Sequence, residues 1–220
     1  MAAEELFDVC DEWGRPLGRR KARSLVHRDG DWHRSFHCWL VDTDDANESS
    51  LLLQRRALDK DTNPGLWDVS VAGHYAAGEG VEGGLREIRE EIGLHVEERE
   101  LVLAGWRREE VFYENGLIER EVQDVYFLAR RIHLLSLRPD LAEVIAVARL
   151  PTAIFVSLTS GLLNEVTVRS GLVDERGRVR LQDVALALGD VVQRADGYYA
   201  RVADFAGRLG TGQTTAPTWW

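Results

Sequence analysis

The chain has 220 residues, of which 27 are Lys or Arg and 37 are Asp or Glu, giving a formal net charge of −10 at pH 7. This length suffices for one domain with a substantial core, or for one domain with an appendage. The acidic balance argues against general binding of nucleic acids, and two cysteines are too few for a disulfide framework and suit a reduced compartment.

The opening residues and the apolar segments favour a cytoplasmic protein. Residues 1–14 are acidic and lack the apolar centre of a secretory signal. The most apolar stretch, residues 153–163, is interrupted by Ser and Thr and is too short to span a membrane. We therefore expect a monomer or homodimer in the cytoplasm that contacts neither membranes nor nucleic acid.

The first part of the chain predicts three strands. Residues 35–41 and 51–56 are rich in residues that favour strands, and the polar turn 42–50 separates them. The turn at residues 63–65, Asn-Pro-Gly, precedes a third predicted strand at residues 67–72.

Further along, the sequence predicts a hairpin and another strand. Residues 101–113 and 117–129 flank Asn115-Gly116, the strongest short hairpin signal in the chain. Residues 142–150 predict a strand that ends at a proline. Strands, a helix, a hairpin and a strand in this order predict a mixed sheet with helices packed on it, of the α/β or α+β class.

The C-terminal part carries weaker patterns. Residues 181–188 and 198–209 have helical spacing of their apolar positions, and residues 172–179 contain a turn that predicts a small hairpin. Residues 210–220 are rich in Gly and Thr and have no period, so we expect a mobile tail.

The most informative segment is REIREEIGL, residues 86–94. In a helix, Glu87, Glu90 and Glu91 share one face within a single turn, and Gly93 stands where helices commonly end in a left-handed cap. Three adjacent carboxylates raise one another's pKa, so a hard cation such as Mg²⁺ suits them. The alternative is a solvated helix with Glu–Arg pairs on its surface.

With its flanking residues, this segment resembles the Nudix hydrolase signature G-x5-E-x7-RE-U-x-EE-x-G-U, in which U is a bulky aliphatic residue. Gly73 and Glu79 match its beginning, but six residues rather than seven separate Glu79 from Arg86. In a helix, one missing residue turns everything before it by about 100°. Because Gly83 and Gly84 weaken a helix, we expect the helix to start near Gly83 and the preceding loop to absorb the shortening. We call residues 73–94 the Nudix box.

Segments around the box resemble the isopentenyl-diphosphate-isomerase-like branch of the same superfamily. They are VHRDGDWHRSFHCWLV, LLLQRR, KDTNPGLWD and VAGH before the box helix, and ENGLIEREVQDVY after it. In the isomerases, histidines and two strand glutamates build a metal site, and the positions that resemble these ligands are His27, His33, His74, Glu119 and Glu121. The isomerase's catalytic cysteine corresponds to Ala72, which carries no titratable group, so the resemblance does not favour isomerase activity.

These resemblances imply a Nudix-type α/β/α sandwich with a mixed sheet. We expect the Nudix domain to span residues 1–155, followed by a C-terminal helical extension of the same domain over residues 156–209.

The implied activity is Mg²⁺-dependent hydrolysis of a diphosphate linkage in a small molecule, with Mn²⁺ as an alternative ion. The substrate would be a nucleoside diphosphate derivative or a short isoprenoid diphosphate. Glu87, Glu90, Glu91 and Glu121 are the candidate metal ligands, and either one of the three box glutamates or Glu121 is the candidate base. Arg86 is expected to orient a box carboxylate through a charge-assisted hydrogen bond.

Other candidate residues surround these carboxylates. Gly73 allows a close approach of the backbone to the helix or metal. The candidate substrate contacts are Arg55, Arg56, Lys60, His33 and His74, although a solvated role fits the three cations equally well. Two alternatives stay open: an isopentenyl-diphosphate isomerase and a non-catalytic binding module with a Nudix-like fold.

Overall fold

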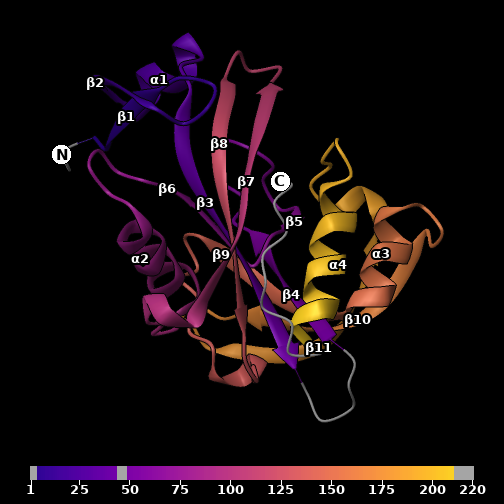
Figure 1. The fold of residues 1–220 in the computed structure, drawn as a ribbon. Helices are drawn as coiled ribbons and strands as arrows, with labels where there is room; N and C mark the ends of the chain where they lie inside the picture. Colours follow the sequence, from indigo (N-terminus) through magenta and orange to yellow (C-terminus); the bar gives the residue numbers. More distant parts are fainter. Residues whose placement is uncertain (1–3, 44–48, 211–220) are drawn as a thin grey trace.

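The computed structural model describes residues 4–43 and 49–210. Its helices and strands follow one another in chain order (Figure 1). They are β1 (Leu6–Cys10), β2 (Pro16–Ala22), α1 (Arg23–Asp29), β3 (His33–Thr43), β4 (Ser49–Arg56), β5 (Trp67–Asp68), β6 (Val71–His74), α2 (Val81–Ile92), β7 (Leu101–Phe112), β8 (Ile118–Ala129), β9 (Val144–Pro151), α3 (Thr152–Thr159), β10 (Glu165–Val173), β11 (Val179–Ala187) and α4 (Tyr198–Gly210). Short 3-10 helices lie at Glu98–Glu100, Leu134–Ser136 and Leu188–Asp190.

The main sheet is mixed, as the sequence predicts. Its strand order is β11-β10-β9-β4-β3-β8-β7, with β5 paired to β4 and β6 paired to β3. The central pair β3 and β8 is parallel, whereas the other pairs are antiparallel. Strands β1 and β2 form a separate two-stranded sheet, which lies with α1 beside the upper end of β3, at the upper left of Figure 1.

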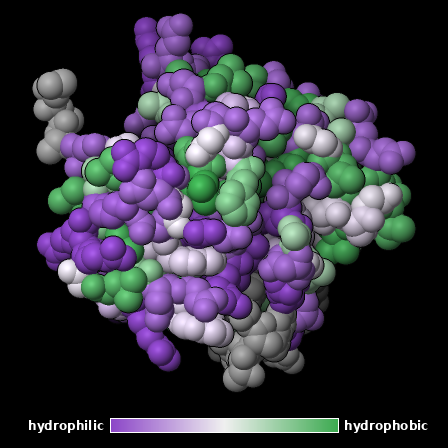
Figure 2. Space-filling view, turned by 90° about the horizontal axis from the view of Figure 1, so that it is seen from above, coloured by the Kyte–Doolittle hydropathy of each residue, from purple (hydrophilic) through white to green (hydrophobic). Residues whose placement is uncertain are grey.

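Helices cover both faces of the main sheet, so the predicted α/β/α arrangement is confirmed (Figure 1). Alternate side chains of β3 point to opposite faces. Phe36 and Leu40 pack with Ile88 of α2 on one face, whereas Trp39 packs with Phe155 of α3 and the residues of α4 on the other. The face seen from above in Figure 2 is mostly hydrophilic, broken by smaller apolar areas.

Two predictions in the middle of the chain have different outcomes. The hairpin around Asn115-Gly116 is confirmed, because β7 and β8 pair up to Phe112 and Ile118 and the glycine adopts a φ of 84°. The single strand predicted at residues 67–72 is wrong. Around Ser70 the segment changes its pairing partner from β4 to β3, so it divides into β5 and β6. The Ser70 hydroxyl donates a hydrogen bond to Leu52 O of β4 and accepts one from Leu40 N of β3.

The C-terminal part is less helical than the sequence predicts. Residues 181–188 were expected to be helical, but residues 179–187 form strand β11, which pairs with β10 along its whole length. The turn predicted within residues 172–179 connects these two strands, and the helix predicted at residues 198–209 is α4. Because β10 pairs with β9, residues after 155 continue the main sheet.

Three further expectations concern the limits of the chain and its cysteines. Gly210 ends α4, and the rest of the predicted mobile tail lies outside the described residues. Among residues 4–43 and 49–210, no helix combines the length and apolar character needed to cross a membrane. Cys10 and Cys38 are buried free thiols.

Candidate active site

On one side of β3, the neighbouring strand changes along the length of β3. It is β6 over Ser35–Cys38 and β4 over Val41–Thr43. A cavity of about 460 Å³ is lined there by residues of β3, β4, β6, α2, β7 and β8. The cavity therefore lies where the Nudix box meets the centre of the sheet.

Helix α2 begins at Val81, two residues earlier than the expected start near Gly83. Gly83 and Gly84 both lie in the first turn of this helix, and this turn packs so closely against its neighbours that a side chain at either position has no room. A Cβ on Gly84 would lie 2.2 Å from Phe36, and one on Gly83 would lie 2.6 Å from Glu79. The helix ends as predicted, with Gly93 in the left-handed conformation at a φ of 74°.

The three box glutamates line the cavity together with Glu119 and Glu121. Glu91 is 5% exposed, and its carboxylate accepts hydrogen bonds from Ala72 N at 3.2 Å and Gln54 Nε2 at 3.1 Å. Strands β4 and β6 thus hold the carboxylate of Glu91 in place, in the cavity that the other carboxylates also line.

Arg86 contacts the box carboxylates as expected. One guanidinium nitrogen donates to Glu87 at 2.9 Å and to Glu90 at 3.2 Å, and the other donates to Glu79 at 3.0 Å. Glu79 also accepts a hydrogen bond from Ala76 N at 2.9 Å. Despite the shortened spacing, Glu79 therefore reaches Arg86.

Burial and mutual repulsion act on Glu87 and Glu91. Burial raises the pKa of Glu91 to about 8, and the neighbouring Glu87 adds to the rise. Burial likewise raises the pKa of Glu87 to about 7, although Arg86 opposes the change. Twelve acidic and five basic side chains line the cavity. This surplus of oxygen donors fits a divalent cation, which would also allow a phosphate to enter.

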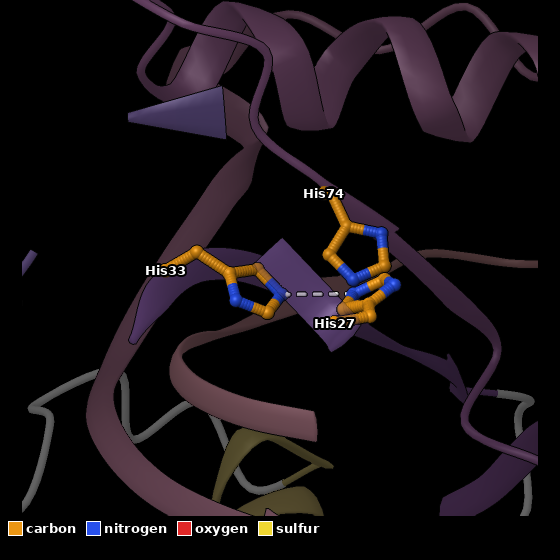
Figure 3. Close-up of side chains that lie close together, drawn as sticks. All are labelled: His27, His33 and His74. Atoms are coloured by element: carbon orange, nitrogen blue, oxygen red, sulfur yellow. Dashed lines mark hydrogen bonds between the residues drawn. The ribbon is translucent and has the colours of Figure 1, made fainter. Parts of the chain in front are cut away.

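Three histidines converge on one another (Figure 3). His27 of α1, His33 of β3 and His74 of β6 each place a ring nitrogen so that the three atoms lie within 4.8 Å of one another. The Nε2 atoms of His27 and His33 are 3.4 Å apart. Phe7 stacks on His33 and His74, with ring centroids 5.2 and 4.8 Å apart. We call His27, His33 and His74 the histidine cluster.

Glu121 joins the histidine cluster to the cavity. Its Oε1 atom lies 2.9 Å from Nε2 of His74 and 3.8 Å from Nε2 of His33. Its Oε2 atom accepts hydrogen bonds from Ser35 at 2.9 Å and Gln123 at 2.6 Å. Burial lowers the pKa of His27 to about 3 and that of His33 to about 4, so both rings are neutral at pH 7. Neutral imidazoles beside a carboxylate are suitable metal ligands.

Comparisons with known proteins agree with this geometry. The family model described as NUDIX domain matches residues 31–159. An uncharacterised Nudix hydrolase of Clostridium acetobutylicum is 33% identical over 196 residues, covering 89% of this chain and 94% of that protein. The chain belongs to the Nudix hydrolase family.

Other relatives support both resemblances. Nudix hydrolase 3 of Arabidopsis thaliana is 40% identical over 57% of this chain, which matches 16% of that longer protein. An isopentenyl-diphosphate Δ-isomerase of Mycolicibacterium vanbaalenii is 35% identical over 64% of this chain and 74% of that protein. A crystal structure from Deinococcus radiodurans shares the fold, with a TM-score of 0.51 and 21% identity over 71% of this chain and 90% of its own.

Of the three cations expected to contact the substrate, Arg56 and Lys60 line the cavity and Arg55 does not. Lys60 pairs with Glu143, and Arg56 donates to Thr62 O at 3.1 Å. The structure does not bring Arg55 to the cavity, because its Nε atom donates to Gly65 O at 2.8 Å and it is not among the lining residues.

Several lining residues of this Nudix domain were not identified from the sequence. Buried Arg194, between β11 and α4, donates to Asp68 at 2.8 Å and pairs with Glu109. His37 and Arg23 also line the cavity. Alternation along β7 places Glu109 on the cavity face and is a signal that could have found it. Arg194 had no comparable signal, because it lies outside a regular element and 126 residues from Asp68.

Proposed function

We propose that this protein hydrolyses a diphosphate linkage in a small molecule with Mg²⁺, and that Mn²⁺ can replace Mg²⁺. The substrate is a nucleoside diphosphate derivative or a short isoprenoid diphosphate. The observation that carries the proposal is the convergence of Glu87, Glu90 and Glu91 with Glu121 on one acidic cavity. Family membership supports hydrolysis, and the oxygen-rich donor set supports Mg²⁺.

We assign roles in this reaction to the box glutamates, to Glu121 and to four cations of the cavity. Glu87, Glu90, Glu91 and Glu121 would hold the ion, which would supply charge stabilisation at the phosphoryl oxygens and lower the pKa of the attacking water. One of these glutamates takes the proton of the attacking water. Arg86 keeps Glu87 and Glu90 in place through the hydrogen bonds described above. Three of the four remaining lining cations, Arg56, Lys60 and Arg23, are assigned to the substrate phosphates, whereas Arg194 is paired with Asp68 and Glu109.

The histidine cluster is proposed as a second metal site. Three imidazoles and Glu121 form a mixed nitrogen and oxygen donor set, which favours a transition-metal ion over Mg²⁺. Glu119 lines the same cavity, and its carboxylate accepts a hydrogen bond from Tyr113 at 2.8 Å. His33 is fully buried, so we assign it to the metal rather than to the substrate.

The isomerase is the second candidate, because the histidine cluster stands at positions that resemble the metal ligands of the isomerases, although the isomerase relatives themselves do not favour it. An isomerase must protonate and deprotonate carbon, which requires a positioned acid and base. Ala72 lines the cavity at the position of the isomerase cysteine and offers neither. Cys10 and Cys38 are not among the described residues that line the cavity.

A screen for release of phosphate or pyrophosphate tests the proposal. Wild-type protein is incubated with nucleoside and isoprenoid diphosphates, with Mg²⁺, with Mn²⁺ and after chelation. We expect metal-dependent release from at least one substrate and no interconversion of isopentenyl and dimethylallyl diphosphates. Isomerisation without hydrolysis would replace the proposal by the isomerase, and binding without any turnover would replace it by the binding module.

A further inference from the structure

His37 of β3 lies directly opposite Ala72 of β6. The two residues pair in the antiparallel register of these strands, and both line the cavity. Side chains of directly opposed residues point to the same face of a sheet, with Cβ atoms about 5 Å apart. The backbone N–H of Ala72 donates to Glu91 of the Nudix box. His37 therefore reaches the cavity beside the box carboxylates, and the side chain opposite it on β6 is only a methyl group.

Tyr198 of α4 contacts one ring nitrogen of His37. The indole N–H of Trp39 donates to the Tyr198 oxygen at 2.8 Å, and His37 Nδ1 lies 3.0 Å from the same oxygen. A hydroxyl that accepts one hydrogen bond becomes a stronger donor in another. The Arg107 guanidinium lies 4.4 Å from the centroid of the tyrosine ring and favours negative charge on the oxygen, which strengthens the donor further. We assign the hydroxyl as the donor to Nδ1, so the neutral imidazole carries its proton on Nε2.

The Nε2–H group of His37 is an uncharged and uncommitted donor. In the described part of the chain it has no hydrogen-bond partner, although the residue is 3% exposed. Burial lowers the pKa of His37 to about 3, and Arg194 adds to the change, so the ring is neutral at pH 7. The lining cations Arg86, Arg194 and Lys60, by contrast, form ion pairs with carboxylates. A neutral N–H forms no such pair and stays available to an oxygen of a ligand.

We propose that His37 is a further catalytic residue, which donates a hydrogen bond from Nε2 to a phosphoryl oxygen of the bound diphosphate, and that Tyr198 is the positioning residue that keeps the proton on Nε2. This inference rests on the proposed function, because it places the diphosphate at the Nudix box carboxylates. A fixed donor aimed at an oxygen on which negative charge develops stabilises the transition state without reorganisation during the reaction. Helix α4 thus acts on the reaction through a residue of β3.

NMR spectra of the imidazole rings test this hydrogen bond without requiring turnover. The protein, prepared with isotopically labelled histidine, is loaded with Ca²⁺ in place of Mg²⁺ and titrated with methylenediphosphonate, which has no cleavable anhydride. His37→Gln identifies the signals of His37. We expect the Nε2–H tautomer in the free protein and a downfield shift of its proton when the probe binds. The Nδ1–H tautomer, an unshifted proton in the complex, or failure of the probe to bind each overturns the inference.

Three substitutions separate this role from folding. His37→Leu removes the donor, so kcat should fall by ~10²-fold with a smaller change in KM, whereas His37→Gln keeps a donor and should recover part of the loss. Tyr198→Phe keeps the ring but removes the hydroxyl that holds Nδ1, so Nδ1–H becomes populated and kcat should fall by ~10-fold.

Tyr75→Phe is the matched control, because it removes a buried hydroxyl that donates to Asp124 outside the cavity. An unchanged kcat in folded His37→Leu overturns the role of His37, and an unchanged tautomer in folded Tyr198→Phe overturns that of Tyr198. Absence of turnover in the wild type would contradict the proposed function alone, because the NMR titration does not depend on hydrolysis.

Discussion

Gly73 faces Glu87 so closely that a Cβ atom at this position would lie 2.4 Å from the Glu87 carboxyl carbon. Gly73 does not adopt a positive φ, so the backbone itself accepts alanine. Space for the neighbouring carboxylate, rather than conformational freedom, is therefore the reason for glycine.

Gly73→Ala should lower hydrolysis by about 10²-fold, because a displaced Glu87 carboxylate no longer holds the ion in place. Activity is measured at saturating Mg²⁺, and circular dichroism checks folding. Gly207→Ala is the control, since a Cβ there meets no atom within 4 Å and its φ is not positive. Full activity of Gly73→Ala would show that Glu87 is not needed where the structure places it.

Glu90→Gln and Glu91→Gln should each lower activity by at least ~10²-fold, because the substitution keeps the size of the side chain and removes a ligand charge. The wild type should gain thermal stability with millimolar Mg²⁺, and each variant should gain less. Exposed Glu114 provides the matched control, Glu114→Gln. Wild-type rates in either variant at saturating Mg²⁺ would remove that residue from the metal site.

Glu79→Gln should cost much less than Glu90→Gln. Glu79 accepts hydrogen bonds from Arg86 and from Ala76 N, and a glutamine oxygen can accept both. The two variants are compared at the same Mg²⁺ concentrations. An equal loss would indicate that the charge of Glu79 acts on the ion despite the shortened spacing.

His27→Ala should reduce the transition-metal content of the purified protein, because it removes one of three converging imidazoles. Metal content is measured by mass spectrometry after dialysis, independently of activity. His95→Ala, a histidine outside the cluster, serves for comparison. Equal metal content in the wild type and His27→Ala would argue against a metal at the histidine cluster.

Arg194→Leu should destabilise the fold by ~1–3 kcal/mol at pH 7, because it removes the cation between buried Asp68 and Glu109 and leaves Asp68 with Arg56 at 3.7 Å and Glu109 with Arg107 at 3.0 Å. Burial raises the pKa of Asp68, but Arg194 and Arg56 lower it further, so its pKa lies below the ordinary value. In the wild type this pairing therefore stabilises the fold above about pH 4 and is lost as the pH falls further.

The variant should lose less stability than the wild type as the pH falls. Without Arg194, burial raises the pKa of Asp68 relative to the wild type while Arg56 still opposes the rise, so protonation of Asp68 relieves the destabilisation as the pH falls. The difference in unfolding free energy between the wild type and the variant should then shrink from neutral to acidic pH. Urea unfolding across this range tests the sign, and a constant difference would contradict it.

The sequence predicted the local parts of the site well. Three box glutamates within one helical turn, a hairpin at Asn115-Gly116 and alternation along β8 are properties of neighbouring residues, so short segments contain the signal. The resemblance to the isomerases brought together three histidines from separate elements, and the structure places them side by side. Whether they bind metal stays a prediction.

Long-range contacts explain what the sequence did not predict. Apolar residues at 181, 184, 185 and 188 have helical spacing, yet pairing with β10 makes this segment an edge strand. Likewise, nothing near Arg194 indicates that it lies beside Asp68, because a loop position carries no periodicity. Gly83 and Gly84 weaken an isolated helix, and only the packing of Phe36 and Glu79 shows why they are tolerated within α2.

The position of Arg194 late in the chain has a consequence for synthesis. A nascent chain that has reached residue 159 contains every carboxylate of the Nudix box and all three clustered histidines, but it lacks the cation that lies between Asp68 and Glu109. It also lacks Tyr198, which bonds Trp39 and His37 from α4. The ribosome therefore delivers Arg194 after the four other cations that line the cavity, and the site cannot be completed until nearly the whole chain has been made.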